Sequence, residues 1–390
     1  MTWSSSLKVL AALPTASGRI SKLNHLTTLS NVLSERRIGN DSNNHIFRGP
    51  LTGQPTFNDS EEIQKSVQDS RPYWFIFSGL GSQSNALPKE LFSVEPFMES
   101  LSISRKILQG LGITTEELLH PNNTSIYTCL RSGLLSLSVV QMALYETIKN
   151  LLPSVPSGLI GHSAGEILSG YADGCLNAEQ VILIQDACAR AMLATKKSQG
   201  GMTAVGLSWE AAQTICPPDV YPSCEHTPNS IMVSGASESL NLFAMKLEAK
   251  GVFVRNVQTC GFAPHSPFMN EASELLEEYL KDIIPNEIPR SNKWINTTAL
   301  KKDWESPELK YSSRKYYTNI IRNPVWFYQA LQHIPNEAVV IEMSPTCIFA
   351  GIVKESLPTA QYFSPILKNG QLNPFLSNNS QDTGNTFLKQ

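Results

Sequence analysis

The chain has 390 residues, of which 41% are hydrophobic and 17% are charged, with a formal net charge of −3. This composition predicts a globular protein that is long enough for two or three domains. The near-neutral charge, without a basic stripe, argues against a nucleic-acid partner. No apolar run approaches the roughly 18 residues that a membrane span needs, so we expect no membrane partner.

The seven cysteines are an odd number and form no C-x-x-C pair. This pattern argues against a zinc ribbon or a disulfide framework. It favours reduced thiols, no bound metal and a cytoplasmic location. The N-terminal apolar patch is interrupted by Pro14, so no signal sequence is predicted.

The first predicted strand follows a mixed polar segment, residues 1–70, which we interpret as a small linker or adaptor. The apolar run Tyr73–Phe77 ends in S-G-L-G, which predicts a buried strand closed by a tight loop. The next predicted elements are a long helix over 131–152, a strand over 158–160, and helices over 164–171 and 178–196.

The pattern of predicted elements changes after residue 200, from mainly helices to alternating strands and helices. Residues 202–257 predict a β-α-β-α-β string of the size of a split βαβ domain. Further predicted elements are a helical region over 267–283, a strand over 338–343 and a helix over 348–356. The polar residues 371–390 are predicted to be a disordered tail.

A serine lies between two glycines at the point where a predicted strand meets a predicted helix, in Gly161-His-Ser163-Ala-Gly165. Such a turn exposes a serine Oγ, and the helix N-terminus supplies N–H groups for an oxyanion. The pattern alone leaves two alternatives open: Ser163 is a nucleophile, or it is an ordinary serine in a glycine-rich loop.

A serine nucleophile needs a base, and seven histidines are available. His265 differs from the others because glycine, proline and apolar residues surround it in C-G-F-A-P-H-S-P-F-M, which indicates a shaped loop. His162 is next to Ser163 and is predicted to point away from it. The remaining histidines are predicted to be surface or capping residues (His120, His226, His333) or to lie in the adaptor segment (His25, His45).

Three motifs in register, F-S-G-L-G-S-Q, G-H-S-A-G-E and F-A-P-H-S-P-F-M, resemble the malonyl/acetyl acyltransferase domain of an animal type I fatty acid synthase. The resemblance covers about residues 10–370, and residues 1–70 are similar to the linker domain that precedes it. It implies an α/β fold with an α/β-hydrolase-like core over 71–197 and 266–370. A ferredoxin-like α+β subdomain would be inserted at 198–265.

The resemblance also implies a reaction and its partners. An acetyl or malonyl group would move from acyl-CoA to a serine, and then to the phosphopantetheine thiol of an acyl carrier protein. The carrier protein and a ketosynthase domain of the same synthase would be partners, and no cofactor would be bound permanently.

Site residues follow from the same resemblance. Ser163 is implied to be the nucleophile and His265 its general base, with a main-chain carbonyl near Asn319 or Ile320 orienting the imidazole. Other implied residues are the oxyanion-hole N–H groups of Leu80 and Ala164, the loop residue Gln83, and the acyl-CoA contacts Asn229, Ser230 and Phe253.

The sequence departs from the family at the acyl pocket. Malonyl-transferring members have an arginine where this chain has Cys188, and that arginine pairs with the substrate carboxylate. Arg190 is about 200° further round a helix and should point away. Pro264 precedes the expected base and would stiffen its loop. Cys188 and Pro264 are therefore predicted to line a pocket that prefers a neutral group such as acetyl over malonyl.

Two alternatives remain open. One is an α/β-hydrolase esterase or thioesterase, a family that orders its triad as serine, acid, histidine. The other is a truncated or degenerate acyltransferase domain without activity.

Overall fold

The computed structural model describes residues 71–152, 154–195, 199–367, 369–373 and 376. These residues belong to the unit Asn44–Gln390. The predicted linker at 1–70 and most of the predicted tail at 371–390 lie outside the described residues.

The larger sheet supplies the frame for the site. Its strands are β1 (Tyr73–Phe77), β2 (Gly158–Gly161), β8 (Trp294–Ile295), β11 (Val339–Met343) and β12 (Gln361–Phe363). They are parallel, in the order β12-β11-β1-β2-β8. The strands predicted over 73–77, 158–160 and 338–343 are confirmed.

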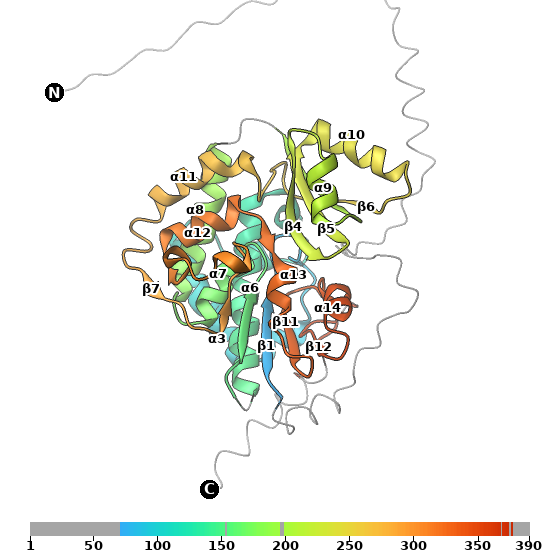
Figure 1. Cartoon of the computed structure of the whole chain (residues 1–390). Helices are drawn as coiled ribbons and strands as arrows, with labels where there is room; N and C mark the ends of the chain where they lie inside the picture. Colours follow the sequence, from blue (N-terminus) through green and yellow to red (C-terminus); the bar gives the residue numbers. More distant parts are fainter. Residues whose placement is uncertain (1–70, 153, 196–198, 368, 374–375, 377–390) are drawn as a thin grey trace, which may run out of the picture. The chain divides into compact units, whose positions relative to one another are not determined.

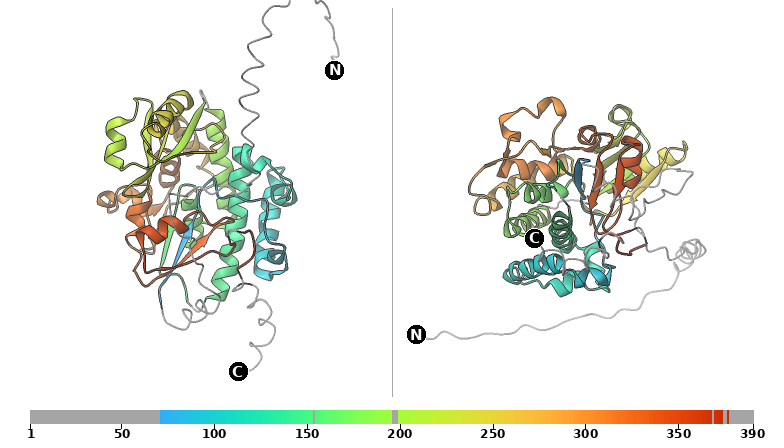
Figure 2. Two further views of the ribbon diagram at one scale, coloured as in Figure 1. Left: turned by 90° about the vertical axis from the view of Figure 1, so that its right-hand side faces the viewer. Right: turned by 90° about the horizontal axis from the view of Figure 1, so that it is seen from below.

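Helices cover both faces of this sheet (Figures 1 and 2). Phe75 and Phe77 of β1 pack with one group of helices, whereas Trp74 and Ile76 pack with the other. The pleat of the strand causes this alternation, and burial on both faces explains why the whole strand is apolar. The first group is α3 (Glu95–Gly110), α6 (Leu130–Leu151), α7 (Gly165–Ala172), α8 (Ala178–Ala194), α11 (Asn270–Tyr279) and α12 (Arg314–Arg322); the second is α13 (Phe327–Leu331) and α14 (Ala350–Ser356).

The smaller sheet is formed mainly by residues 200–257 and differs from the prediction by one strand. Its elements are β3 (Gly200–Val205), α9 (Trp209–Ile215), β4 (Val220–Thr227), β5 (Ser230–Ala236), α10 (Ser237–Glu248) and β6 (Val254–Val257). The sequence did not predict β4, because Pro222 interrupts it and its pairing with β5 shifts register twice. The sheet order is β10-β4-β5-β3-β6, where β10 (Val325–Trp326) joins from a later part of the chain.

The small sheet also has two apolar faces. On one face, Val205, Ile231 and Val233 form a cluster with side chains of α9 and α10. On the other face, Met202 and Met232 belong to the cluster that contains Trp74 and Ile76 of the large sheet. The two sheets are thereby joined by a continuous core.

The remaining elements are short. They are η1 (Lys89–Ser93), α4 (Thr115–Leu119), α5 (Ser125–Thr128), η2 (Pro267–Met269), β7 (Ile288–Pro289), η3 (Lys301–Asp303), η4 (Pro307–Leu309) and β9 (Tyr311–Ser312). The predicted long helix over 131–152 is confirmed as α6. Among the described residues, no helix is both long and apolar enough to span a bilayer.

Gly165 is required by the close approach of α7 to β1. A Cβ at this position would lie 2.1 Å from the carbonyl oxygen of Phe77, and that backbone cannot move without disturbing the sheet. We expect Gly165→Ala to lower the free energy of unfolding by about 3 kcal/mol or more in urea titrations. The matched control is Gly110→Ala in α3, where a Cβ meets no atom within 4 Å, and stability should change by no more than about 1 kcal/mol. Equal losses in both variants would contradict the steric argument.

Candidate active site

The turn between β2 and α7 carries Ser163 in a strained conformation. Its φ is +56°, a region that residues with a side chain rarely adopt. A Cβ on Gly161 would lie 2.4 Å from the backbone of Glu166, so strand and helix approach too closely for a larger residue. The turn has the geometry that the glycine spacing predicts, and it presents the Ser163 hydroxyl to a pocket.

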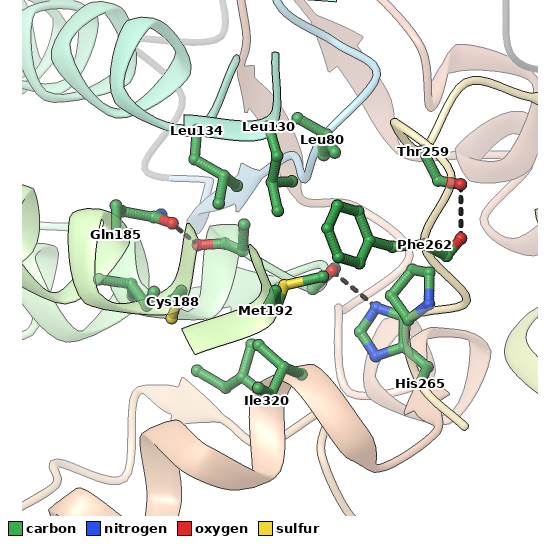
Figure 3. Close-up of a pocket in the computed structure, with 15 residues that line it drawn as sticks. Leu80, Leu130, Leu134, Gln185, Cys188, Met192, Thr259, Phe262, His265 and Ile320 are labelled. Atoms are coloured by element: carbon green, nitrogen blue, oxygen red, sulfur yellow. Dashed lines mark hydrogen bonds between the residues drawn. The ribbon is translucent and has the colours of Figure 1, made fainter. Parts of the chain in front are cut away.

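His265 lies beside the serine hydroxyl (Figure 3). Ser163 Oγ is 2.7 Å from His265 Nε2, and His265 Nδ1 is 3.0 Å from the carbonyl oxygen of Asn323. A carbonyl oxygen can only accept, so Nδ1 carries the proton and Nε2 is left as the acceptor. Nε2 is therefore in the protonation state that accepts a proton from Ser163.

The carbonyl that orients His265 belongs to Asn323, not to Asn319 or Ile320 as the resemblance implied. Helix α12 ends at Arg322, and the carbonyl of Asn319 accepts from the Asn323 N–H at 2.9 Å. The carbonyl of Asn319 is therefore used in the last turn of the helix, whereas Asn323 follows the helix end, where carbonyls have no intrahelical partner. The carbonyl of Ile321 holds the loop from the other side, because it accepts from the His265 N–H at 2.8 Å.

Two further residues bring N–H groups to the site, Leu80 from the loop after β1 and Ala164 from the turn after β2. Neither Leu80 nor Ala164 donates its N–H to another group within the described residues, and both line the pocket at Ser163. Gln83 holds the loop after β1 in place. Its Oε1 accepts from the Gly81 N–H at 2.7 Å, and its Nε2 donates to the Ile126 carbonyl at 2.9 Å. The loop is thus held by Gln83 rather than by bonds at Leu80.

The pocket in front of Ser163 is apolar, with a cavity volume of about 50 Å³. Cys188 and Pro264 both line it, and their contact with an acyl group stays a prediction. Burial raises the pKa of the Cys188 thiol to about 12, so the thiol is neutral at physiological pH. The sequence did not single out most of the wall, which includes Leu130, Leu134, Ile167, Met192, Phe262 and Ile321.

Comparison with known proteins identifies the family. Residues 74–388 match the family model described as "Acyl transferase domain". The chain belongs to this acyl transferase domain family. The predicted family is therefore confirmed, whereas the finer resemblance to animal fatty acid synthases stays a prediction.

Similar proteins include large fungal synthases. The acyltransferase domain is 30% identical over 310 residues to the highly reducing polyketide synthase rstn3 of Aspergillus nomiae, covering 75% of this chain and 12% of the synthase. It is 28% identical over 309 residues to the synthase cla2 of Cladosporium cladosporioides, covering 73% of this chain and 13% of that protein. The chain thus spans about an eighth of the length of these relatives.

Solved structures share its fold. The acyltransferase domain of the polyketide synthase PpsC of Mycobacterium tuberculosis matches with a TM-score of 0.65 at 20% identity, over 75% of this chain and 91% of that one. A loading acyltransferase from the avermectin modular polyketide synthase matches with a TM-score of 0.68 at 20% identity, over 79% and 99%. At this level of identity the likeness shows the fold.

Two arginines of the acyltransferase domain lie near the pocket but are held outside it. Arg131 and Arg190 both pair with Asp186, a buried residue on α8. Arg190 Nε lies 2.8 Å from Asp186, and its guanidinium stacks 4.6 Å from the Tyr279 ring centroid. The prediction that Arg190 points away is confirmed, and no lysine or arginine is among the described residues that line the pocket.

The predicted acyl-CoA contacts lie apart from this pocket. Asn229 is exposed in the turn between β4 and β5, and Ser230 is the first residue of β5. Phe253 precedes β6 and packs at the edge of the core. None of the three lines the Ser163 pocket, and their contact with acyl-CoA stays a prediction.

His226 is buried, which corrects its prediction as a surface or capping residue. It lies on β4, and its Nε2 is 2.9 Å from Nε2 of His162, with ring planes 19° apart. With Cys224 these histidines form a group whose ligand atoms lie within 4.8 Å, a residue set of the kind that Zn²⁺ prefers. The 2.9 Å between the two Nε2 atoms fits equally well an N–H···N hydrogen bond between two neutral imidazoles.

Acid should destabilise the acyltransferase domain through these buried imidazoles. Burial lowers the pKa of His265 to about 4 and that of His226 to about 3, below the ordinary value of 6.5. The unfolded chain therefore binds more protons below pH 6.5, so stability is complete above that pH and falls as pH decreases toward 4. We expect a loss of about 1.4 kcal/mol per pH unit from each histidine, measured by urea unfolding between pH 7 and pH 4.5.

A variant isolates one contribution to this acid sensitivity. His226→Gln removes one titrating ring, so its unfolding free energy should depend less steeply on pH than that of the unmodified chain. An identical slope in both proteins would contradict the assignment of a neutral, buried His226.

Proposed function

We propose that this domain transfers an acyl group from acyl-CoA, through an ester on Ser163, to the phosphopantetheine thiol of an acyl carrier protein. The observation that carries the proposal is the chain of contacts from Ser163 Oγ to His265 Nε2 and from His265 Nδ1 to the Asn323 carbonyl. It joins a nucleophile to a correctly oriented base at the mouth of an apolar pocket.

The reaction has two matched halves. Ser163 Oγ attacks the thioester carbonyl while His265 Nε2 takes the proton of the serine hydroxyl. His265 then gives this proton to the sulfur of CoA, which leaves as the free thiol. In the second half, His265 takes the proton of the carrier thiol, the sulfur attacks the ester carbonyl, and the proton returns to Ser163. The N–H groups of Leu80 and Ala164 would stabilise the oxyanion in both halves.

The partner of His265 argues against the esterase alternative. A hydrolase triad places a carboxylate on the base nitrogen that does not face serine, whereas here Nδ1 donates to a neutral carbonyl. Retention of both Ser163 and His265 in bonding contact argues against an inactive remnant.

A neutral acyl group fits this pocket better than malonyl. Cys188 is a neutral thiol, and the nearby Arg131 and Arg190 are both paired with Asp186. A malonyl carboxylate would be buried without a counter-ion, which costs several kcal/mol (roughly 3–5). We therefore propose that acetyl or a similar uncharged acyl group is the preferred substrate.

The domain would work within a multidomain synthase, with a carrier protein and a ketosynthase as partners. Support comes from the polyketide synthase relatives, and the motif resemblance favours fatty acid synthesis within this class. The parallel large sheet supports an α/β-hydrolase-like core over 71–197 and 266–370. The order β4-β5-β3-β6 supports a ferredoxin-like insert at 198–265.

Initial-rate kinetics test the proposal. With acetyl-CoA and a phosphopantetheinylated carrier protein both varied, a two-step transfer through Ser163 gives parallel lines in double-reciprocal plots. Release of free acid in the absence of carrier protein would instead indicate an esterase. Absence of both transfer and hydrolysis, with any acyl-CoA, would indicate an inactive domain.

A further inference from the structure

The apolar pocket has two polar side chains on its wall that the proposed chemistry does not use, Thr259 and Gln185. Thr259 Oγ1 donates to the Phe262 carbonyl oxygen at 2.6 Å, so its hydroxyl proton is engaged. Gln185 lies on α8 one turn before Cys188 and lines the pocket. Only 1% of it is exposed, and its amide end makes a hydrogen bond (dashed line in Figure 3). Gln185 Nε2 donates to the Ala164 carbonyl oxygen at 3.2 Å.

This hydrogen bond fixes which end of the amide is free. The Ala164 carbonyl can only accept, so the nitrogen of Gln185 must face it and Oε1 must lie on the other side. Gln185 Oε1 is buried and has no hydrogen-bond partner within the described residues. A buried acceptor without a donor is unfavourable, so Oε1 is available to accept a hydrogen bond from a group that enters the pocket.

The location of the amide restricts which part of a substrate can supply the donor. Gln185 bonds to the carbonyl of Ala164, the residue that follows the nucleophile, and its side chain lines the pocket that an acyl group on Ser163 would enter. The surrounding wall of Leu134, Ile167 and Met192 is apolar, which disfavours a charged donor such as an ammonium group. A hydroxyl is the neutral donor that an acyl chain can carry there.

We infer that the pocket is built for short, uncharged acyl groups whose chain carries a hydroxyl, which donates to Gln185 Oε1. This inference rests on the proposed function and names its substrate class. Hydroxyacyl groups satisfy the acceptor, whereas the matching unsubstituted chains leave it unpaired.

The test compares two substrates of equal chain length. Acyl-Ser163 formation is measured by intact-protein mass spectrometry with 3-hydroxybutyryl-CoA, in both stereoisomers, and with butyryl-CoA. We expect the unmodified chain to load one hydroxyacyl isomer at least about tenfold faster than butyryl. Gln185→Met, which keeps length but removes the acceptor, should reduce this ratio to near one.

A matched control separates recognition from pocket shape. Met192→Leu alters the same pocket wall without touching a polar group, so it should keep the hydroxyacyl-to-butyryl ratio of the unmodified chain. The ratio, rather than the absolute rate, is read because Gln185→Met also removes the bond to Ala164.

The possible results are distinct. Equal loading of both substrates by the unmodified chain, as a water bound at Oε1 would produce, overturns the inference and leaves the proposed function intact. An unchanged ratio in Gln185→Met overturns it as well. Failure of every acyl-CoA to label Ser163 overturns the proposed function, and the inference with it.

Discussion

Replacing Ser163 with alanine is expected to abolish the acyl-enzyme and to lower transfer to carrier protein by about 10⁴-fold or more. The hydroxyl is the only group at this turn that bonds to His265 Nε2 in the described structure, so its loss removes the acyl acceptor itself. His265→Ala should cost a similar factor, because the serine is weak without its base. The double variant should be scarcely worse than either single one.

The matched control for this experiment is Ser169→Ala. Ser169 is a buried serine on α7, the helix that begins just after the nucleophile, and it does not line the pocket. Its variant should still acquire one acyl group. An acyl group on the Ser163→Ala chain would contradict the assignment of the nucleophile.

Introducing a cation into the pocket should change which acyl group is loaded onto Ser163. Cys188→Arg places a guanidinium at the predicted carboxylate position, where it can pair bidentately with malonyl. Asp186 is already paired with Arg131 and Arg190, which limits its competition for the new side chain. We expect malonyl loading to rise by about 10–100-fold, corresponding to a gain of about 1.5–3 kcal/mol from a charged hydrogen-bonded pair. Acetyl loading should fall, because the guanidinium would then be buried without a partner.

Cys188→Leu controls for volume, since it enlarges the side chain without adding charge. Malonyl loading should remain low in this variant. If the unmodified chain loads malonyl as readily as acetyl, the argument from the neutral pocket is wrong.

Local sequence patterns predicted the framework of the site. The five-residue apolar run of β1 and the spacing of Gly161 and Gly165 each specify their structure over a few residues. The strand and the serine turn were therefore predictable. Helix α6 was predictable for the same reason, because its apolar residues recur at helical spacing and no glycine or proline follows Gly133 within it.

Features that depend on distant partners were not predictable. Strand β4 contains Pro222 and pairs with β10 from about 100 residues later, so its own sequence does not look like a strand. The burial of His226 was missed along with it. The choice of Asn323 over Asn319 depended on where α12 ends, and helix ends are poorly specified by sequence. Gln185 had a usable signal, because it precedes Cys188 by three residues on a predicted helix and so shares its face.

The most direct test of the central claim is to locate the acyl group by peptide mass mapping after the chain meets acetyl-CoA. The proposed mechanism predicts one acetyl group on Ser163, which moves to the phosphopantetheine thiol when carrier protein is added. Acetyl bound at another residue, or lost to water at the same rate without carrier protein, would contradict it.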